Sequence, residues 1–251
     1  PRPELTSAGT PAMREYFLVA PYNDLAALRR IITENPAELA GVIIEPLQRC
    51  TPPKPGFLEG VRAACTEAGI LLIFDEVVTG FRLAYGGAQE YYGVVPDLIA
   101  YGKALGGGYP IGAFGGRTDI MEWTNEHRIG GSDYVWMAST LGGNPISAAA
   151  ANAALGVFRQ PGTYEKLHGL GFYLRGGMSK VLARRQINAQ IIGDGPLAQV
   201  VFSADPVFDY RSTKKGDSAR GRALMLALFD RGVFVNPMGT KLYISMAHDK
   251  A

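Results

Sequence analysis

The sequence is poor in the residues that build disulfide frameworks and metal centres. Its 251 residues include two cysteines, Cys50 and Cys65, and three histidines in dissimilar contexts. Two cysteines cannot form the disulfide framework of a small secreted domain, and the histidines show no metal-ligand spacing. We therefore expect no metal site and a chain that works in the reducing cytoplasm.

An excess of charge and long apolar runs are also lacking. The chain has 25 basic and 23 acidic residues, a net charge of +2, and its basic residues are scattered. We expect no nucleic-acid partner because there is no basic field, and no membrane partner because no run approaches the roughly 18 apolar residues of a span. The chain begins with Pro1 rather than Met and has no secretory leader, so we expect a piece of a longer protein.

Three short apolar runs each end at one chemically useful residue. The runs are 41–44, 70–74 and 98–102, and the residues that follow them are Glu45, Asp75 and Lys103. Apolar runs without polar alternation are typical of strands buried on both faces of a parallel sheet. Ligands of open α/β sheets bind at the carboxyl ends of the strands, so two carboxylates and an amine there predict an active site. A lysine amine suits Schiff-base chemistry.

Helical periodicity between the runs predicts how the strands are connected. Segments 24–32 and 57–68 carry apolar residues at helical spacing, and Gly69 is a C-cap signal. The order of strands and helices indicates a mainly parallel sheet with right-handed crossovers. We also expect a buried strand at 111–116 and an alanine-rich helix over 145–159 that is too apolar to lie on a surface.

The pattern of predicted helices and strands changes near residue 160. A helix over 164–185, strands at 199–203 and 242–245, and a helix at about 218–231 predict a small α+β domain. The predicted organisation is a partial large α/β domain over 1–160 and a truncated small C-terminal domain over 161–251.

Lys103 is the sharpest candidate for a functional residue. It follows a buried strand and precedes a glycine-rich turn, so we expect an amine that reaches water with difficulty. Desolvation would lower its pKa and make it a better nucleophile, whereas the alternative is a surface lysine on an edge loop. A phosphate-binding P-loop does not fit, because Ala104 and not Ser or Thr follows the lysine.

The acidic and hydroxyl candidates each have a structural alternative. Asp75 could bind Mg²⁺, cap a helix or hold a cationic nitrogen, and Lys103 one strand further on favours the last role. Glu45 could only satisfy backbone amides, and Arg49 could be a solvated loop charge. The segment 139–145, which contains Thr140, is either a phosphate cradle or an ordinary helix cap.

Several segments resemble the class III, pyridoxal-phosphate-dependent aminotransferases. They are 41–46, 53–60, 71–82, 85–90, 96–98 with Gly102-Lys103, and 140–145. The stretch 81–90 is most similar to the glutamate-1-semialdehyde aminomutase branch, and the likeness runs almost end to end, closing with 245–248. The resemblance implies the fold of type I pyridoxal-phosphate enzymes.

The resemblance also implies a role for each candidate. Lys103 would form the Schiff base with pyridoxal 5'-phosphate (PLP) and move a proton, and Asp75 would pair with the ring nitrogen. Val77 would pack against one ring face, and Glu45 would belong to the polar network beside the ring. Thr140 would bind the cofactor phosphate of the neighbouring subunit, which implies a homodimer.

Departures from the family pattern bear on the reaction. The family's N-terminal portion has no counterpart, so its phosphate turn and stacking aromatic are absent, and Val78 stands where many members have Gln. A shorter loop after Glu45 and a segment 237–241 without an acidic residue weaken the aminomutase interpretation. We expect an aminotransferase that acts on an amino acid or ω/β-amino donor and a keto or aldehyde acceptor. The alternatives are glutamate-1-semialdehyde 2,1-aminomutase and a non-catalytic fragment.

Arg49 is the candidate for binding a substrate carboxylate. It lies four residues past Glu45, on the loop that leaves a strand end. A guanidinium can hold a carboxylate with two parallel hydrogen bonds, which lysine does not reproduce.

Overall fold

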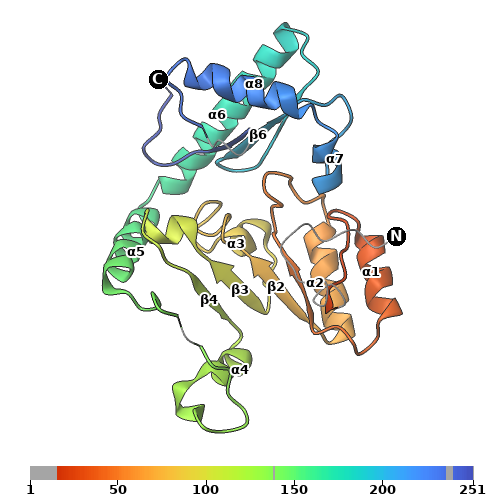
Figure 1. The fold of residues 1–251 in the computed structure, drawn as a ribbon, viewed down its shortest axis with the longest axis vertical. Coiled ribbons are helices and arrows are strands. Elements are labelled where there is room, and N and C mark those ends of the chain that lie inside the picture. Colours follow the sequence, from red (N-terminus) through yellow and green to blue (C-terminus); the bar gives the residue numbers. More distant parts are fainter. Residues whose placement is uncertain (1–15, 138, 236–239, 251) are drawn as a thin grey trace.

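The computed structural model describes residues 16–137, 139–235 and 240–250, and it contains two sheets (Figure 1). The first sheet has the strand order β1 (Gly41–Ile44), β2 (Leu71–Asp75), β3 (Leu98–Tyr101) and β4 (Ala113–Gly116). Strands β1, β2 and β3 are parallel, and β4 is antiparallel to β3. The three strands expected from the apolar runs, and their parallel arrangement, are confirmed.

Two helices cover one face of this sheet. Helix α1 (Leu25–Glu34) begins at Asp24, whose carboxylate accepts a hydrogen bond from the amide of Ala27. Helix α2 (Phe57–Ala68) has the expected bounds and ends at Gly69, which adopts a φ of +67°. The core under these helices consists of Leu28, Val61, Cys65, Leu72, Phe74 and Ile99, among others. Burial of each large apolar side chain contributes about 1.5–3 kcal/mol.

The other face of the sheet is less covered, so the expectation of strands buried on both faces is wrong for this chain. Along β2, Leu72 and Phe74 are buried, whereas Leu71 and Ile73 are only partly buried. Ile43 of β1 is 65% exposed, and β4 is an exposed edge strand. The reason is that α1 and α2 pack against one face only.

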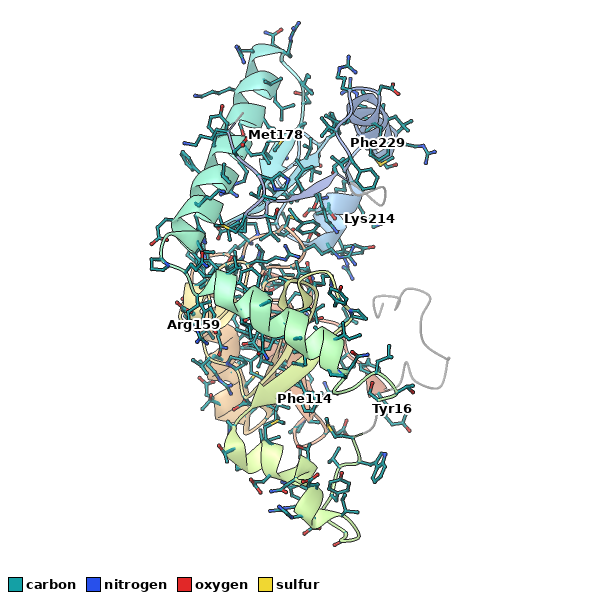
Figure 2. All side chains as sticks on the ribbon, turned by 90° about the vertical axis from the view of Figure 1, so that its left-hand side faces the viewer. Tyr16, Phe114, Arg159, Met178, Lys214 and Phe229 are labelled. Atoms are coloured by element: carbon teal, nitrogen blue, oxygen red, sulfur yellow. The ribbon has the colours of Figure 1, made fainter. Side chains whose placement is uncertain are left out.

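The alanine-rich helix is also more exposed than its composition predicts. Helix α5 (Pro145–Phe158) buries Ser147 and Ala151 but exposes apolar side chains such as Ile146 and Val157. Figure 2 shows it in front of the sheet with Phe114 nearby. It packs on the turn after β3, where a Cβ built on Gly107 would lie 3.4 Å from the Cβ of Ala154. The expectation that this helix is buried is therefore wrong.

The second sheet has the antiparallel order β5 (Gln190–Ile192), β6 (Leu197–Val201) and β7 (Lys241–Tyr243). It is accompanied by α6 (Thr163–Arg184), α7 (Tyr210–Lys214) and α8 (Ser218–Phe229). The other elements given for the described residues include α3 (Ala88–Tyr92), α4 (Thr118–Met121) and the short 3₁₀ turns Lys103–Gly106, Glu122–Thr124 and Glu126–Arg128. The boundary near residue 160 stays a prediction.

In the described part of the chain, no helix is long and apolar enough to cross a membrane.

The second sheet packs on the loops that leave β1 and β2. Leu197 of β6 is buried together with Leu47, Cys50 and Leu83. His168 of α6 lies 2.7 Å from the carbonyl oxygen of Leu83 through its Nε2 atom. These contacts place the smaller sheet beside the carboxyl ends of the parallel strands.

Asp97 links strands β2 and β3 at the ends where these two strands begin. Its Oδ2 accepts hydrogen bonds from the Leu72 amide and from Arg62, both at 2.7 Å, and its Oδ1 accepts one from Arg117 at 3.1 Å. Burial by itself raises the pKa of Asp97, but these hydrogen bonds outweigh it and hold the pKa below its usual value. The ionised carboxylate therefore stabilises the fold.

We expect Asp97→Asn to lower the free energy of unfolding at pH 7 by about 2 kcal/mol, because a buried acceptor of three hydrogen bonds loses its charge. Since the folded pKa lies below the unfolded value of about 3.9, this stabilisation is present at neutral pH. It is lost as the pH falls through the folded pKa. Urea denaturation at pH 7 and pH 3 should show a smaller acid effect in the variant. Asp119→Asn, which alters an exposed partner of Arg117, is the control and should change stability by less than about 0.5 kcal/mol.

Candidate active site

The first sheet brings three of the candidate residues to one edge. Ile44 of β1 pairs with Phe74 of β2, and Asp75 pairs with Ala100 of β3. Glu45 follows Ile44 directly, and Lys103 lies three residues beyond Ala100. Because the strands are parallel neighbours, the two carboxylates and the amine leave the sheet on the same side.

Asp75 and Val77 form the centre of this edge. Asp75 is half-buried, and its Oδ1 accepts a hydrogen bond of 3.1 Å from the amide of Val77. Among the described residues, no side-chain cation lies within 4 Å of the Asp75 carboxylate. A Cβ built on Gly102 would lie 3.4 Å from a methyl group of Val77. Val77 therefore contacts the backbone that presents Lys103.

Lys103 is held in an unusual backbone conformation. It begins a single 3₁₀ turn, Lys103–Gly106, with a φ of +45°, which non-glycine residues adopt at a cost of about 1–2 kcal/mol. Such strain is concentrated at functional sites. The side chain is exposed in this chain, so the expectation that it reaches water with difficulty is wrong here.

The side chains of Glu76 and its neighbour Asp75 differ in burial and in the groups that they contact. Its carboxylate is fully buried and accepts hydrogen bonds from the Thr79 hydroxyl and from the amides of Ala88 and Gln89 at the start of α3. Burial raises the pKa of Glu76, although these hydrogen bonds act in the opposite direction. Glu76 thus caps the start of α3, whereas the Asp75 carboxylate accepts a hydrogen bond from the Val77 amide.

Glu45 and Arg49 are joined through the loop backbone. The Oε2 atom of Glu45 accepts a hydrogen bond of 3.1 Å from the Arg49 amide, which is the backbone role considered as its alternative. Arg49 has a φ of +62°, and its guanidinium lies over the ring of Tyr210 at 5.0 Å. The arginine therefore faces α7, and among the described residues it forms no ion pair with Asp75.

Thr140 stands apart from the other candidates. It lies in an exposed turn ahead of α5, whose N-cap is Asn144. Within the described ranges, no hydrogen bond joins Thr140 to Asp75, Lys103 or Glu45. Its assignment to a neighbouring subunit's cofactor stays a prediction.

Two cations near this edge were not found from the sequence. Arg82 is half-buried, with its guanidinium over the ring of Tyr243, and its Nε is buried without a hydrogen-bond partner in the part of the chain that is described. Burial lowers the pKa of Arg82. Lys241 of β7 is half-buried. Both residues lie in segments compared with the family, but their surroundings come from distant segments, so the sequence does not indicate their burial. No group of His, Cys, Asp and Glu within the described residues could hold a metal ion.

Comparison with known proteins places this geometry in a family. The sequence profile of class-III aminotransferases matches residues 7–248. A glutamate-1-semialdehyde 2,1-aminomutase from Myxococcus xanthus is 42% identical over 92% of this chain and 53% of its own length. The chain belongs to the class-III aminotransferase family, and the likeness to the aminomutase branch is confirmed. It spans about half the length of the curated relatives it matches.

Solved structures agree with this assignment. An ω-transaminase from Sphaerobacter thermophilus has a TM-score of 0.87 and 34% identity, covering 96% of this chain and 55% of that chain. A transaminase structure with PLP bound has a TM-score of 0.81 and 26% identity, covering 93% and 53% of the two chains. The fold is therefore that of the type I PLP transaminases, as expected.

The strained backbone at Lys103 gives a testable consequence. Lys103→Gly should be more stable than Lys103→Ala by about 1 kcal/mol, because glycine adopts a positive φ without a Cβ clash. Lys215, which has a φ of −75°, is the matched control. There the alanine variant should be the more stable of the two. Urea denaturation of the four variants measures both differences, and the same order at both positions would contradict the strain.

Proposed function

We propose that this chain carries the cofactor-binding edge of a PLP-dependent aminotransferase. The observation that supports the proposal is the meeting of Asp75, Val77 and Lys103 at neighbouring strand ends, with Val77 against Gly102. An acid without a side-chain cation nearby among the described residues, an exposed amine and an apolar wall suit a flat pyridine ring. The residues present fit the cofactor.

Each residue has one task in this proposal. Asp75 holds the ring nitrogen in its protonated form, and Val77 limits the position of one ring face. The Lys103 amine holds the cofactor and, when released, moves a proton next to it. The bound cofactor supplies an electron sink for the carbon that bears the substrate amine. Glu45 belongs to the polar groups beside the ring.

The reaction proposed is transfer of an amino group from an amino acid or ω/β-amino compound to a keto or aldehyde acceptor. The likeness to the Sphaerobacter ω-transaminase supports this reaction. The likeness to the Myxococcus aminomutase favours a second candidate, the 2,1-aminomutase reaction, in which the amino group stays on one substrate skeleton. A ¹⁵N-labelled donor separates the two, because transfer places the label on a different carbon skeleton.

A homodimer is part of the same proposal. Large apolar side chains are exposed on and near α5: Phe114, Trp136, Leu141, Ile146 and Val157. Figure 2 views this side of the molecule. Exposed apolar groups gathered in one region are typical of an interaction surface. A second copy on this surface would bring Thr140 to the partner's cofactor.

The compartment that we propose for this protein is the cytoplasm.

The assignment of Lys103 is tested by chemical labelling. The 251-residue chain is mixed with PLP and reduced with borohydride, which fixes the pyridoxyl group to the amine that held it. Peptide mapping should find the label on Lys103, and Lys103→Ala should remain unlabelled. A label on Lys54 or Lys241 would overturn the assignment.

The role of Asp75 is tested by its affinity for the cofactor. Asp75→Asn should weaken PLP binding about tenfold, since a charge-assisted hydrogen bond contributes roughly 1.5–3 kcal/mol. Titration followed by the cofactor's absorbance gives the dissociation constants, and thermal unfolding checks that the variant folds. Glu59→Gln, on the exposed side of α2, serves as a control for the loss of one acid. Equal affinity in wild type and Asp75→Asn would remove Asp75 from the site.

A further inference from the structure

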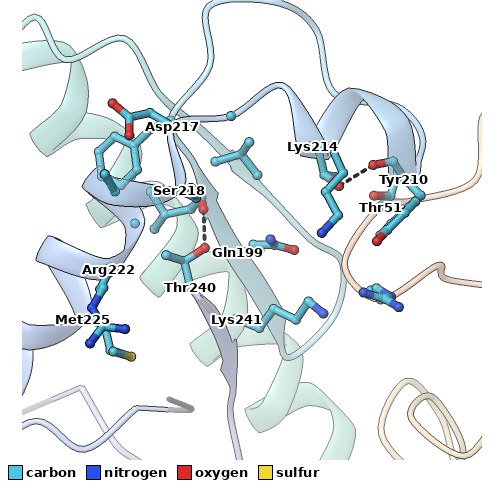
Figure 3. A pocket seen from close by; sticks show the side chains of 18 of the residues that line it. Thr51, Gln199, Tyr210, Lys214, Asp217, Ser218, Arg222, Met225, Thr240 and Lys241 are labelled. Atoms are coloured by element: carbon cyan, nitrogen blue, oxygen red, sulfur yellow. Dashed lines mark hydrogen bonds between the residues drawn. The ribbon is translucent and has the colours of Figure 1, made fainter. Parts of the chain in front are cut away.

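A cavity of about 640 Å³ lies between the second sheet and the loop after β1. Its walls come from that loop, β6, α7, the start of α8 and β7. Figure 3 shows Lys214 of α7 and Lys241 of β7 reaching into the same space, with Tyr210 beside them. Arg49 and Gln48 line it from the loop.

Four cationic residues, Arg49, Lys214, Arg222 and Lys241, line this cavity, and three of them act on one another electrostatically. The guanidinium of Arg49 lies 5.0 Å from the centre of the Tyr210 ring, and the ammonium of Lys214 lies 5.1 Å from the same centre. Burial lowers the pKa of Lys241, and the charges of Arg49 and Lys214 lower it further, whereas Glu45 and Cys50 oppose the change. The three positive groups therefore share one electrostatic environment.

The cations have no carboxylate partner in the part of the chain that the structure describes. None of Arg49, Lys214 and Lys241 lies within 4 Å of an acidic oxygen there. Glu45 is occupied by the backbone amide of Arg49. Asp217, the acid that lines the cavity, caps α8 through the amide of Arg220. Mutual repulsion of unpaired cations is unfavourable unless an anion joins them.

Gln48 also leaves a polar atom without a partner. Its Oε1 atom is buried and has no hydrogen-bond partner among the described residues, although the residue lines the cavity. Buried polar atoms are nearly always satisfied. An acceptor oxygen calls for a hydrogen-bond donor, so an anion is inferred here from the three cations alone.

We propose that the cavity binds the carboxylate-bearing end of a small dianionic substrate through Arg49, Lys214 and Lys241. The assignment to a substrate rests on the proposed function. The loop from Glu45 to Arg49 connects the cavity to the strand end that would hold the cofactor. A dicarboxylic amino acid or keto acid matches this arrangement, because its negative charge complements a group of three cations.

Binding of glutarate to the 251-residue chain tests the proposal directly. Isothermal titration should show binding of glutarate, and Arg49→Gln or Lys241→Met should weaken it about tenfold each, since each removes a charged donor. Propylamine should not bind. Inorganic phosphate is the other dianion tested, and binding tighter than that of glutarate would overturn the assignment to carboxylates.

Matched controls separate a local effect from a general loss of charge. Lys214 lines the cavity and its neighbour Lys215 does not, so Lys214→Gln should weaken glutarate binding and Lys215→Gln should not. Without ligand, Lys241→Met should leave the melting temperature unchanged or raise it, because it relieves repulsion. Equal glutarate affinity in the Lys214→Gln and Lys215→Gln variants would overturn the site.

The outcome is independent of the cofactor assignment. Glutarate binding without pyridoxyl label on Lys103 would keep the dianion site and reject the proposed function. A label on Lys103 without glutarate binding would reject the dianion site alone.

Discussion

The parallel pairing of β2 with β1 and β3 is the constraint on which the rest of the structure depends. It fixes Glu45, Asp75 and Lys103 at one edge, because the strand ends of parallel neighbours coincide. Asp97 secures the opposite end of the same pair by accepting from the Leu72 amide and from two arginines. Among the described residues, no comparable ion pair joins the strand ends that carry Glu45, Asp75 and Lys103, so the opposite ends hold this pair of strands together.

The same sheet leaves apolar surface uncovered in this chain. Ile43 and Phe114 are exposed on strands, and Ile146 is exposed on a helix that is mostly apolar. Lys103 is exposed as well, although it follows a buried strand. These observations share a physical reason. An apolar segment needs neighbouring residues to cover it, and the described residues of one chain cover these segments only in part. The chain covers about half of its relatives' length, in agreement with such a deficit.

Local signals and long-range contacts differ in what the sequence could predict. The bounds of α2 were predictable because its apolar spacing and Gly69 lie within the segment. The division of labour between Asp75 and Glu76 was not, because the amides that Glu76 accepts from belong to α3, twelve and thirteen residues away. Arg82 and Lys241 were missed for the same reason, since their burial depends on contacts with distant segments. The proposed role of Thr140 involves a second subunit, whose position one sequence does not describe.

Departures from the rules of stable folding occur among the candidate residues and their neighbours. Within the described part of the chain, Lys103 and Arg49 hold positive φ angles, Arg82 is half-buried without an ion pair, and Gln48 keeps an unsatisfied oxygen. Proteins tolerate such costs mainly at functional sites, where the fold over-determines them. The backbone strain at Lys103 and the repulsion among the unpaired cations differ in one respect. The strain at Lys103 is a property of the backbone and persists with or without a ligand. The repulsion among the cations, in contrast, destabilises the fold only while no anion is bound. An anion that binds there relieves the repulsion, and this relief adds to the free energy of binding.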